Sequence, residues 1–176
     1  MPTQQLKKFV IDIPDFPKKG IIFKDITTLL KNGEKFRVVV DSIVKKFKTK
    51  KIDAIVSIEA RGFIVGSVVA YKLGIGIIPV RKKGKLPYLK YSVTYDLEYG
   101  TDTLEIHQDA FKKGARVLIV DDLLATGGTA QAVIKLIKKA GGEVAGLAFI
   151  IELLPLKGRD KLKGYPVYSL IKDRYC

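Results

Sequence analysis

Short apolar runs alternate along the chain with longer segments in which apolar residues recur every three or four positions. The longer segments at 34–49 and 129–140 predict amphipathic helices, and the more uniformly apolar stretch 62–73 predicts a buried one. The short runs are rich in β-branched residues and predict strands. These strands are expected at residues 52–58, 75–81, 117–121, 143–152 and 166–171. The alternation predicts an α/β fold with a mainly parallel sheet flanked by helices.

Residues 82–103 interrupt this alternation. The segment contains two glycines, a proline and four tyrosines, and it is longer than the usual connection of roughly two to six residues. Tyr91, Val93 and Tyr95 alternate with polar residues, a pattern that suits a two-stranded ribbon. We predict a long flexible loop that closes over a site and excludes water. A disordered surface insertion is the alternative.

Composition limits the class of protein. A chain of 176 residues with 47% apolar residues fits a single globular domain, 1–176, and contains no linker or repeat. No apolar run approaches the roughly 20 residues that span a bilayer, so we expect no membrane association. The polar N-terminal segment lacks the apolar core of a secretory signal. The single cysteine, Cys176, excludes an internal disulfide and favours a reducing, cytoplasmic setting.

The chain carries 32 basic and 18 acidic residues, a net charge of +14. Such a surface attracts polyanions. The lysines are scattered along the chain and are not interleaved with aromatic residues as in a stacking platform for bases. We therefore interpret most of them as solvated surface groups and expect no nucleic-acid partner. A nucleic-acid binder with salt-sensitive affinity is the least favoured alternative.

Residues 117–129 form the most informative stretch. Four apolar residues are followed by Asp121 and Asp122, and then by Thr-Gly-Gly-Thr at 126–129, where a helix is predicted to begin. Unpaired backbone amides at a helix start bind anions, and paired carboxylates suit the hydroxyl groups of a sugar. This order predicts a site for a phosphorylated ribose. An ordinary strand–turn–helix joint is the alternative, but it requires neither two acids nor two threonines.

Polar residues follow three of the predicted strands. They lie at 59–62, 81–84 and 121–129. Ligands of parallel α/β sheets bind beyond the carboxyl ends of the strands. We therefore expect these three segments to meet at one edge of the sheet.

The run from Asp121 to Thr129 resembles the 5-phosphoribosyl 1-pyrophosphate (PRPP) motif of the type I phosphoribosyltransferases. Three further segments resemble the N-terminal hood, the pyrophosphate-side loop and the flexible catalytic loop of the adenine-using branch of that family: 12–30, 57–63 and 81–100. The tail, from Gly158 to Leu170, matches as well, so the resemblance covers nearly the whole chain in one order. It implies a Rossmann-like fold with a hood at 1–33 and a flexible loop at 82–103.

The resemblance also implies a reaction. Adenine and PRPP would give AMP and pyrophosphate, with Mg²⁺ that arrives on the substrate phosphates and no metal site built from side chains. Arg61 would serve catalysis because its planar fork matches phosphate oxygens. Glu98 would transfer a proton at the base. Members of the family are typically homodimers, so we expect a homodimer here.

Twelve residues would bind substrate if the resemblance holds. They are Ile22, Lys24, Arg81, Lys85, Tyr99, Asp121, Asp122, Ala125, Thr126, Gly127, Gly128 and Thr129. Ile22 and Lys24 would hold adenine through backbone contacts and flanking packing. Arg81 and Lys85 would reach the pyrophosphate, and Tyr99 would order the closed loop. The two aspartates would hold the ribose hydroxyls, and the loop from Ala125 onward would hold the 5′-phosphate.

Two other interpretations of the same motif remain open. The chain could be another purine phosphoribosyltransferase, such as a xanthine-type enzyme, and parallel assays with four purines would distinguish it. It could also be a PRPP-sensing regulator without catalysis. Such a regulator normally needs a DNA-binding module, and the residues that precede the first long helix, 1–33, are accounted for by the hood.

Overall fold

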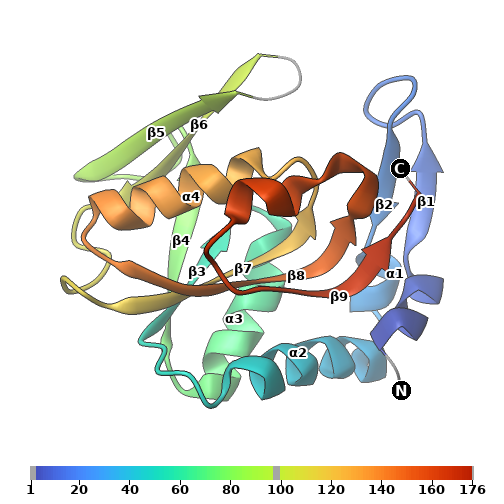
Figure 1. Ribbon diagram of the computed structural model, residues 1–176, viewed down its shortest axis with the longest axis horizontal. Coiled ribbons are helices and arrows are strands. Elements are labelled where there is room, and N and C mark those ends of the chain that lie inside the picture. Colours follow the sequence, from blue (N-terminus) through green and yellow to red (C-terminus); the bar gives the residue numbers. More distant parts are fainter. Residues whose placement is uncertain (1–2, 97–99, 176) are drawn as a thin grey trace.

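The computed structural model describes residues 3–96 and 100–175 (Figure 1). Within these residues a seven-stranded sheet has the order β5–β6–β4–β3–β7–β8–β9. Its strands are β3 (Ala54–Ile58), β4 (Gly76–Lys82), β5 (Lys90–Asp96), β6 (Thr101–His107), β7 (Arg116–Leu124), β8 (Glu143–Leu153) and β9 (Val167–Asp173). The long helices are α2 (Gly33–Phe47), α3 (Arg61–Leu73) and α4 (Gly128–Lys139). Two short 3₁₀ segments, η2 (Leu154–Leu156) and η3 (Gly158–Leu162), precede β9.

The sheet is mainly parallel, as predicted, and helices cover both of its faces. Helices α2 and α3 lie on one face and α4 on the other (Figure 1). From β3 the chain passes through α3 to β4, and from β7 it passes through α4 to β8 on the opposite side. The connection after β3 therefore lies on one face of the sheet, and the connection after β7 lies on the other. In α/β sheets, ligands bind in the crevice between two such neighbouring strands. The β3–β7 ladder ends at the Ser57–Val120 pair, so β7 continues beside β8 alone.

The apolar core lies in two layers, one on each face of the sheet. Ile55 and Leu118 pack with the layer under α2 and α3, whereas Val56 and Ile119 pack with the layer under α4. Successive residues of a strand point to opposite faces, so a strand covered on both faces is apolar at every position. This explains the continuous apolar runs of the sequence. The helix predictions are confirmed to within two residues, and Gly74, the C-cap that follows α3, has a left-handed conformation.

One predicted boundary was wrong. Strand β7 does not end with the two aspartates, because β8 pairs with it as far as Leu124 and keeps it extended. Segment 82–103 contains the two-stranded ribbon that the alternation of Tyr91, Val93 and Tyr95 predicted. Strands β5 and β6 form an antiparallel hairpin, and β6 joins the main sheet by pairing with the end of β4. Residues 97–99 lie outside the described part of the chain, and the flexibility of this segment stays a prediction.

The segment predicted as a hood, 1–33, folds at one end of the sheet. It contains a 3₁₀ helix η1 (Thr3–Phe9), the strands β1 (Ile11–Pro14) and β2 (Ile22–Asp25), and the short helix α1 (Thr27–Leu30). Strands β1 and β2 pair with each other and form a separate two-stranded sheet. Helix η1 lies beside β9, so the N-terminal segment packs against the last strand of the main sheet (Figure 1). Among the described residues, no helix combines the length and the apolar character that a membrane crossing requires.

Candidate active site

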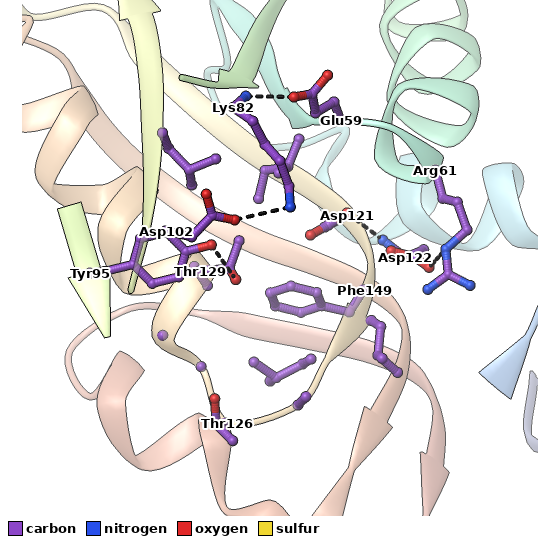
Figure 2. Close-up of a pocket in the computed structure, with 18 of the residues that line it drawn as sticks. Glu59, Arg61, Lys82, Tyr95, Asp102, Asp121, Asp122, Thr126, Thr129 and Phe149 are labelled. Carbon is purple, nitrogen blue, oxygen red and sulfur yellow. Dashed lines mark hydrogen bonds and ion pairs between the residues drawn. The ribbon is translucent and has the colours of Figure 1, made fainter. Parts of the chain in front are cut away.

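A cavity of about 360 Å³ opens at the crevice between β3 and β7 (Figure 2). It is lined by Ile58, Glu59, Ala60, Arg61, Lys82, Tyr95, Asp102, Leu104, residues 121–130 and Phe149. The three polar segments expected to meet at the carboxyl ends of the strands therefore contribute to one pocket. Polar groups surround a small apolar floor that includes Phe149.

One wall of the pocket is the loop between β7 and α4. Gly127 has a φ of +79°, and a Cβ atom there would lie 2.4 Å from the carbonyl oxygen of Gly158. Only glycine combines that dihedral angle with that close approach. No side chain caps α4, and the backbone amides of residues 125–130 donate no hydrogen bond to the described residues. Free amides at a helix N-terminus form a binding site for an anion.

Asp121 and Asp122 stand beside this loop, in the last part of β7. Oδ1 of Asp121 accepts a hydrogen bond of 2.9 Å from the Asp122 amide. Gly62 allows this approach, because a Cβ atom there would lie 2.6 Å from the same oxygen. Burial and the neighbouring charge of Asp122 raise the pKa of Asp121 well above its ordinary value. The fold therefore disfavours the charged form of Asp121 next to Asp122.

Arg61 is the cation nearest to the two acids. It is the first residue of α3, not a loop residue as the sequence predicted. Its Nε lies 2.7 Å from Oδ2 of Asp122, a buried oxygen without a hydrogen-bond partner among the described residues. Nη1 donates to the carbonyl oxygen of Lys24 at 3.2 Å, and the guanidinium carbon lies 4.6 Å from the centre of the Phe23 ring. Arg61 thus connects the hood to the acid pair.

The opposite wall comes from β4 and the β5–β6 hairpin. Its Lys82 belongs to the predicted polar segment 81–84, whereas sequence reasoning did not assign Tyr95 or Asp102 to the site. Nζ of Lys82 lies 3.0 Å from Oδ2 of Asp102, and this contact raises the pKa of Lys82. The hydroxyl of Tyr95 lies 3.2 Å from Oγ1 of Thr129, so the hairpin touches the anion loop (Figure 2). The alternation of Tyr91 and Tyr95 with polar residues was a sequence signal for Tyr95. The contact between Lys82 and Asp102 depends on strand pairing.

Arg81 and Lys85 do not line the cavity, although both were predicted to bind substrate. Nε and Nη2 of Arg81 each donate to Oε2 of Glu59 at 3.1 Å, and Nζ of Lys85 lies 3.5 Å from the same oxygen. Burial alone would raise the pKa of Glu59, but the Lys82 amide and these two cations lower it. Both predicted ligands therefore neutralise a carboxylate at the cavity edge.

The remaining predicted residues are distributed as follows. Arg61, Asp121, Asp122 and the whole loop from Ala125 to Thr129 line the cavity. Ile22 and Lys24 lie on β2 beyond its lining, and Lys24 reaches Arg61 through its carbonyl group. Glu98 and Tyr99 lie outside the described residues.

Comparison with known proteins matches this arrangement to one family. Residues 25–172 match the phosphoribosyl transferase domain family. The chain is 66% identical over 166 residues to an adenine phosphoribosyltransferase of Clostridium perfringens. The aligned region covers 94% of this chain and 96% of that relative.

Solved structures agree with this match. The crystal structure of adenine phosphoribosyltransferase from Thermoanaerobacter pseudethanolicus has a TM-score of 0.94 and 52% identity, covering 97% of this chain and 99% of the other. The Saccharomyces cerevisiae enzyme, complexed with D-2,5-dideoxy-2,5-imino-altritol 1,6-bisphosphate and adenine, has a TM-score of 0.90 and 40% identity. That match covers 96% of this chain and 98% of the yeast chain.

Proposed function

The chain belongs to the phosphoribosyl transferase family, among its adenine phosphoribosyltransferases, and on this premise we propose that it converts adenine and PRPP to AMP and pyrophosphate. The observation that carries the proposal is the joint placement of a free-amide loop and an acid pair in one pocket. The loop suits the 5′-phosphate of PRPP, and the acids suit the hydroxyls of its ribose.

In this arrangement the amides from Ala125 to Thr129, with the two threonine hydroxyls, hold the 5′-phosphate. Asp121 and Asp122 accept hydrogen bonds from the ribose hydroxyls. Positive charge develops on the sugar as the pyrophosphate leaves, and the negative charge of the acid pair stabilises it. Oδ2 of Asp122 supports this role, because it is buried and has no hydrogen-bond partner among the described residues.

The departing pyrophosphate requires cations. Arg61 lies at the pocket and offers a planar fork to phosphate oxygens. Arg81 and Lys85 stand at the edge and share Glu59. If Arg81 and Lys85 bind pyrophosphate, its oxygens must either replace Glu59 as the acceptor of these two cations or bind them together with Glu59.

Adenine lies beside β2 in our proposal, held by backbone groups of Ile22 and Lys24. Glu98 then transfers the proton that a ring nitrogen of the base loses, with N7 as the position favoured by the family resemblance, and Tyr99 orders the closed loop. A carboxylate on a loop that closes over both substrates would reach the base only in the ternary complex.

Mg²⁺ fits this site as a companion of the substrate. The described residues contain no cluster of three or more histidine, cysteine or acidic side chains that would hold a metal ion. Mg²⁺ is usually bound by one or two carboxylates together with phosphate and water oxygens, and Asp121 and Asp122 provide such carboxylates. When bound, Mg²⁺ neutralises charge on the pyrophosphate.

We also propose that the protein is a homodimer. Ile64, Val68 and Tyr71 are exposed and lie on one face of α3, and Ile77 on the neighbouring strand β4 is exposed as well. An apolar face of this kind is typical of a subunit interface. Light scattering coupled to size-exclusion chromatography would measure the mass, and Tyr71→Lys should shift it to the monomer value. A wild-type monomer at micromolar concentration would contradict the proposal.

The reaction itself is tested with the purified protein, PRPP and Mg²⁺, and with adenine, hypoxanthine, guanine and xanthine in parallel. We expect AMP from adenine and little product from the other bases. Glu98→Gln should lower kcat strongly and leave the Kd for PRPP nearly unchanged. Product from xanthine alone would favour the xanthine-type alternative, and PRPP binding without any product would favour the regulator.

A further inference from the structure

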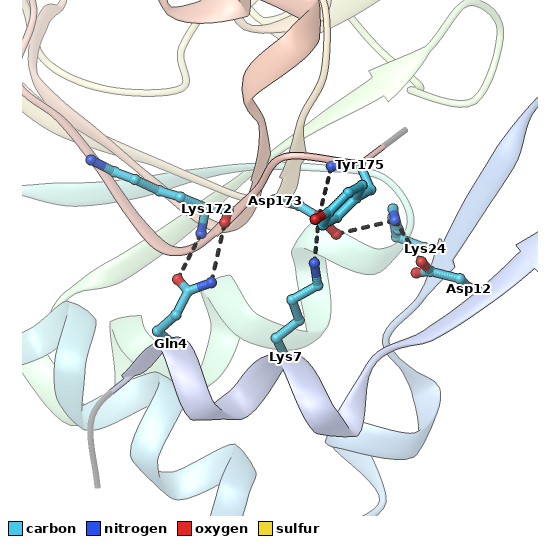
Figure 3. A network of polar contacts seen from close by, with 7 residues as sticks. All are labelled: Gln4, Lys7, Asp12, Lys24, Lys172, Asp173 and Tyr175. Atoms are coloured by element: carbon cyan, nitrogen blue, oxygen red, sulfur yellow. Dashed lines mark hydrogen bonds and ion pairs between the residues drawn. The ribbon is translucent and has the colours of Figure 1, made fainter.

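Lys24 is buried more completely than lysines usually are. Its side chain is 0% exposed, and its ammonium lies 2.9 Å from Oδ2 of Asp12 and 3.1 Å from Oδ2 of Asp173 (Figure 3). A buried ammonium is costly unless it is paired and hydrogen-bonded. Burial alone would lower the pKa of Lys24, but the two aspartates outweigh it and raise the pKa. The lysine therefore remains charged within the fold.

The two carboxylates come from different parts of the chain. Asp12 lies on β1 and Asp173 ends β9. Asp173 also accepts hydrogen bonds from Nζ of Lys7 at 2.6 Å and from the Tyr175 amide at 3.0 Å. We call Lys7, Asp12, Lys24 and Asp173 the hood cluster. It joins η1, β1 and β2 to the end of the main sheet.

Strand β2 needs such an anchor. It pairs with β1, and the two strands form a sheet of their own that shares no ladder with the main sheet in the described residues. Side-chain contacts must therefore set the distance between β2 and the body of the protein. Lys24 spans that gap with an ion pair to Asp173, whose side chain is only 3% exposed.

The backbone of the same residue faces the pocket side. The carbonyl oxygen of Lys24 accepts a hydrogen bond from Nη1 of Arg61, and the adjacent Phe23 ring packs against the same guanidinium. Nε of Arg61 in turn holds Asp122. A continuous set of contacts thus runs from Asp173 through Lys24 and Arg61 to the acid pair.

We propose that Lys24 is a positioning residue for the pocket: its ammonium fixes β2 to the end of β9, and β2 thereby fixes Arg61 against Asp122. The proposal rests on the function proposed above. It assigns the side chain of Lys24 a role separate from any contact between the β2 backbone and adenine. A displacement of the order of 1 Å can lower a rate about 100-fold, so an anchor outside the cavity has a measurable effect on turnover.

The test compares Lys24→Met with wild type in steady-state kinetics, well below the Tm of each protein. Methionine keeps the length and removes the charge. We expect kcat to fall at least about 10-fold and the KM for adenine to rise, while the KM for PRPP changes about threefold or less. Lys24→Arg keeps the cation and should retain most of the activity.

A matched control separates positioning from stability. Ile43 is fully buried in α2, away from the cavity lining, and Ile43→Ala should lower the Tm by leaving a void. We expect it to leave kcat and both KM values of the folded protein unchanged. If Lys24→Met lowers the Tm but matches this control in kcat and KM, the proposal is overturned.

A double-mutant cycle tests the path through Arg61. If Lys24 acts through Arg61, Lys24→Met should lower kcat much less in an Arg61→Lys background than in wild type. Equal fold-losses in the two backgrounds would overturn the proposal. Should Lys24→Met fail to fold, Asp173→Asn removes the same ion pair, and its kinetics decide the question in the same way. If the wild-type protein has no turnover, the proposed function is overturned as well. If the wild-type protein turns over, a negative result with the variants overturns only the role of Lys24.

Discussion

Two clusters in this protein combine aspartates with buried or half-buried cations, and their charge balance differs. In the pocket, Asp122 forms an ion pair with Arg61, whose charge also acts on Asp121. In the hood cluster, Asp12 and Asp173 face two cations, Lys7 and Lys24. The pKa of Asp121 is raised by burial and by the adjacent carboxylate. Burial also acts to raise the pKa of Asp173, but hydrogen bonds from Lys7, Tyr175 and Lys24 lower it.

The difference distinguishes a binding site from a structural contact. Asp173 accepts hydrogen bonds from Lys7 and the Tyr175 amide and pairs with Lys24, so the protein holds this carboxylate in place. Carboxylates that share one cation remain able to accept hydrogen bonds or to approach a metal ion, at a cost in stability. We therefore expect substitutions in the pocket to change binding and turnover, and substitutions in the hood cluster to change stability and the placement of Arg61.

The largest effect is expected from Arg61→Met. Removal of a group that stabilises developing charge typically lowers kcat about 10² to 10³-fold, and Asp122 also loses its cation. The measurement is kcat/KM for AMP formation with the Tm as a check on folding. Lys45→Met, which removes an exposed cation from α2, should leave kcat/KM unchanged. Equal effects of both substitutions would mean that Arg61 acts only through the net charge.

Asp173→Ala should have the next largest effect, on stability. Removing one partner of a buried ion pair costs about 3 kcal/mol, and here two lysines lose their acceptor. Urea unfolding at pH 7 measures the free energy of unfolding, and calorimetric titration measures the Kd for PRPP. We expect the first to fall and the second to stay within about twofold. A large loss of PRPP affinity would contradict the division between the two clusters.

Asp122→Asn should weaken PRPP binding about 10-fold, because a hydrogen bond to a charged acceptor contributes roughly 1.5 kcal/mol or more. The Tm serves as the check on folding, because the variant loses both the repulsion from Asp121 and the ion pair with Arg61. Asp12→Asn is the matched change in the hood cluster and should leave the Kd for PRPP unchanged. Titration calorimetry measures both variants. Unchanged affinity in Asp122→Asn would remove this residue from the ribose site.

The smallest effect is expected in the pH dependence of stability. The folded pKa of Asp121 is raised, so its favourable contribution is present at acid pH and is lost as pH rises from the unfolded pKa through the folded one. The folded pKa of Asp173 is lowered, so its contribution is lost as pH falls from the unfolded pKa through the folded one.

Asp121→Asn should therefore remove a decline in unfolding free energy above pH 4, worth about 1.4 kcal/mol for each unit of pKa difference. Urea unfolding of wild type and variant between pH 4 and 8 measures it. Parallel pH curves for the two proteins would contradict the raised pKa.

Much of this architecture could be predicted from local patterns. The helix face that includes Val133 and Leu136, the apolar β7 and the turn at Gly127 are each encoded within a dozen neighbouring residues. The same holds for the acid pair, which lies next to the loop in sequence and in space. The prediction that the acid pair ends the strand was wrong, because the length of β7 depends on its pairing with β8.

Other parts could not be predicted in this way. The ion pair between Lys82 and Asp102 forms because β6 pairs with β4, and nothing near either residue indicates that pairing. Arg81 and Lys85 were expected to face substrate, but Glu59 holds both at the edge of the cavity. The proximity of Glu59 to these two cations follows from the strand order, which the sequence did not predict.

The sequence by itself determined the parallel α/β class, the family resemblance, the phosphate-type loop and the acid pair, because periodicity, turn chemistry and backbone geometry depend on residues that are close along the chain. Only the tertiary structure decided what surrounds them: the wall made by Lys82, Tyr95 and Asp102, and the hood cluster around Lys24. Burial and ion pairing depend on which strands and chain ends meet. The family resemblance predicts only a backbone contact of Lys24 with adenine, whereas the fold shows that its side chain is a fully buried anchor.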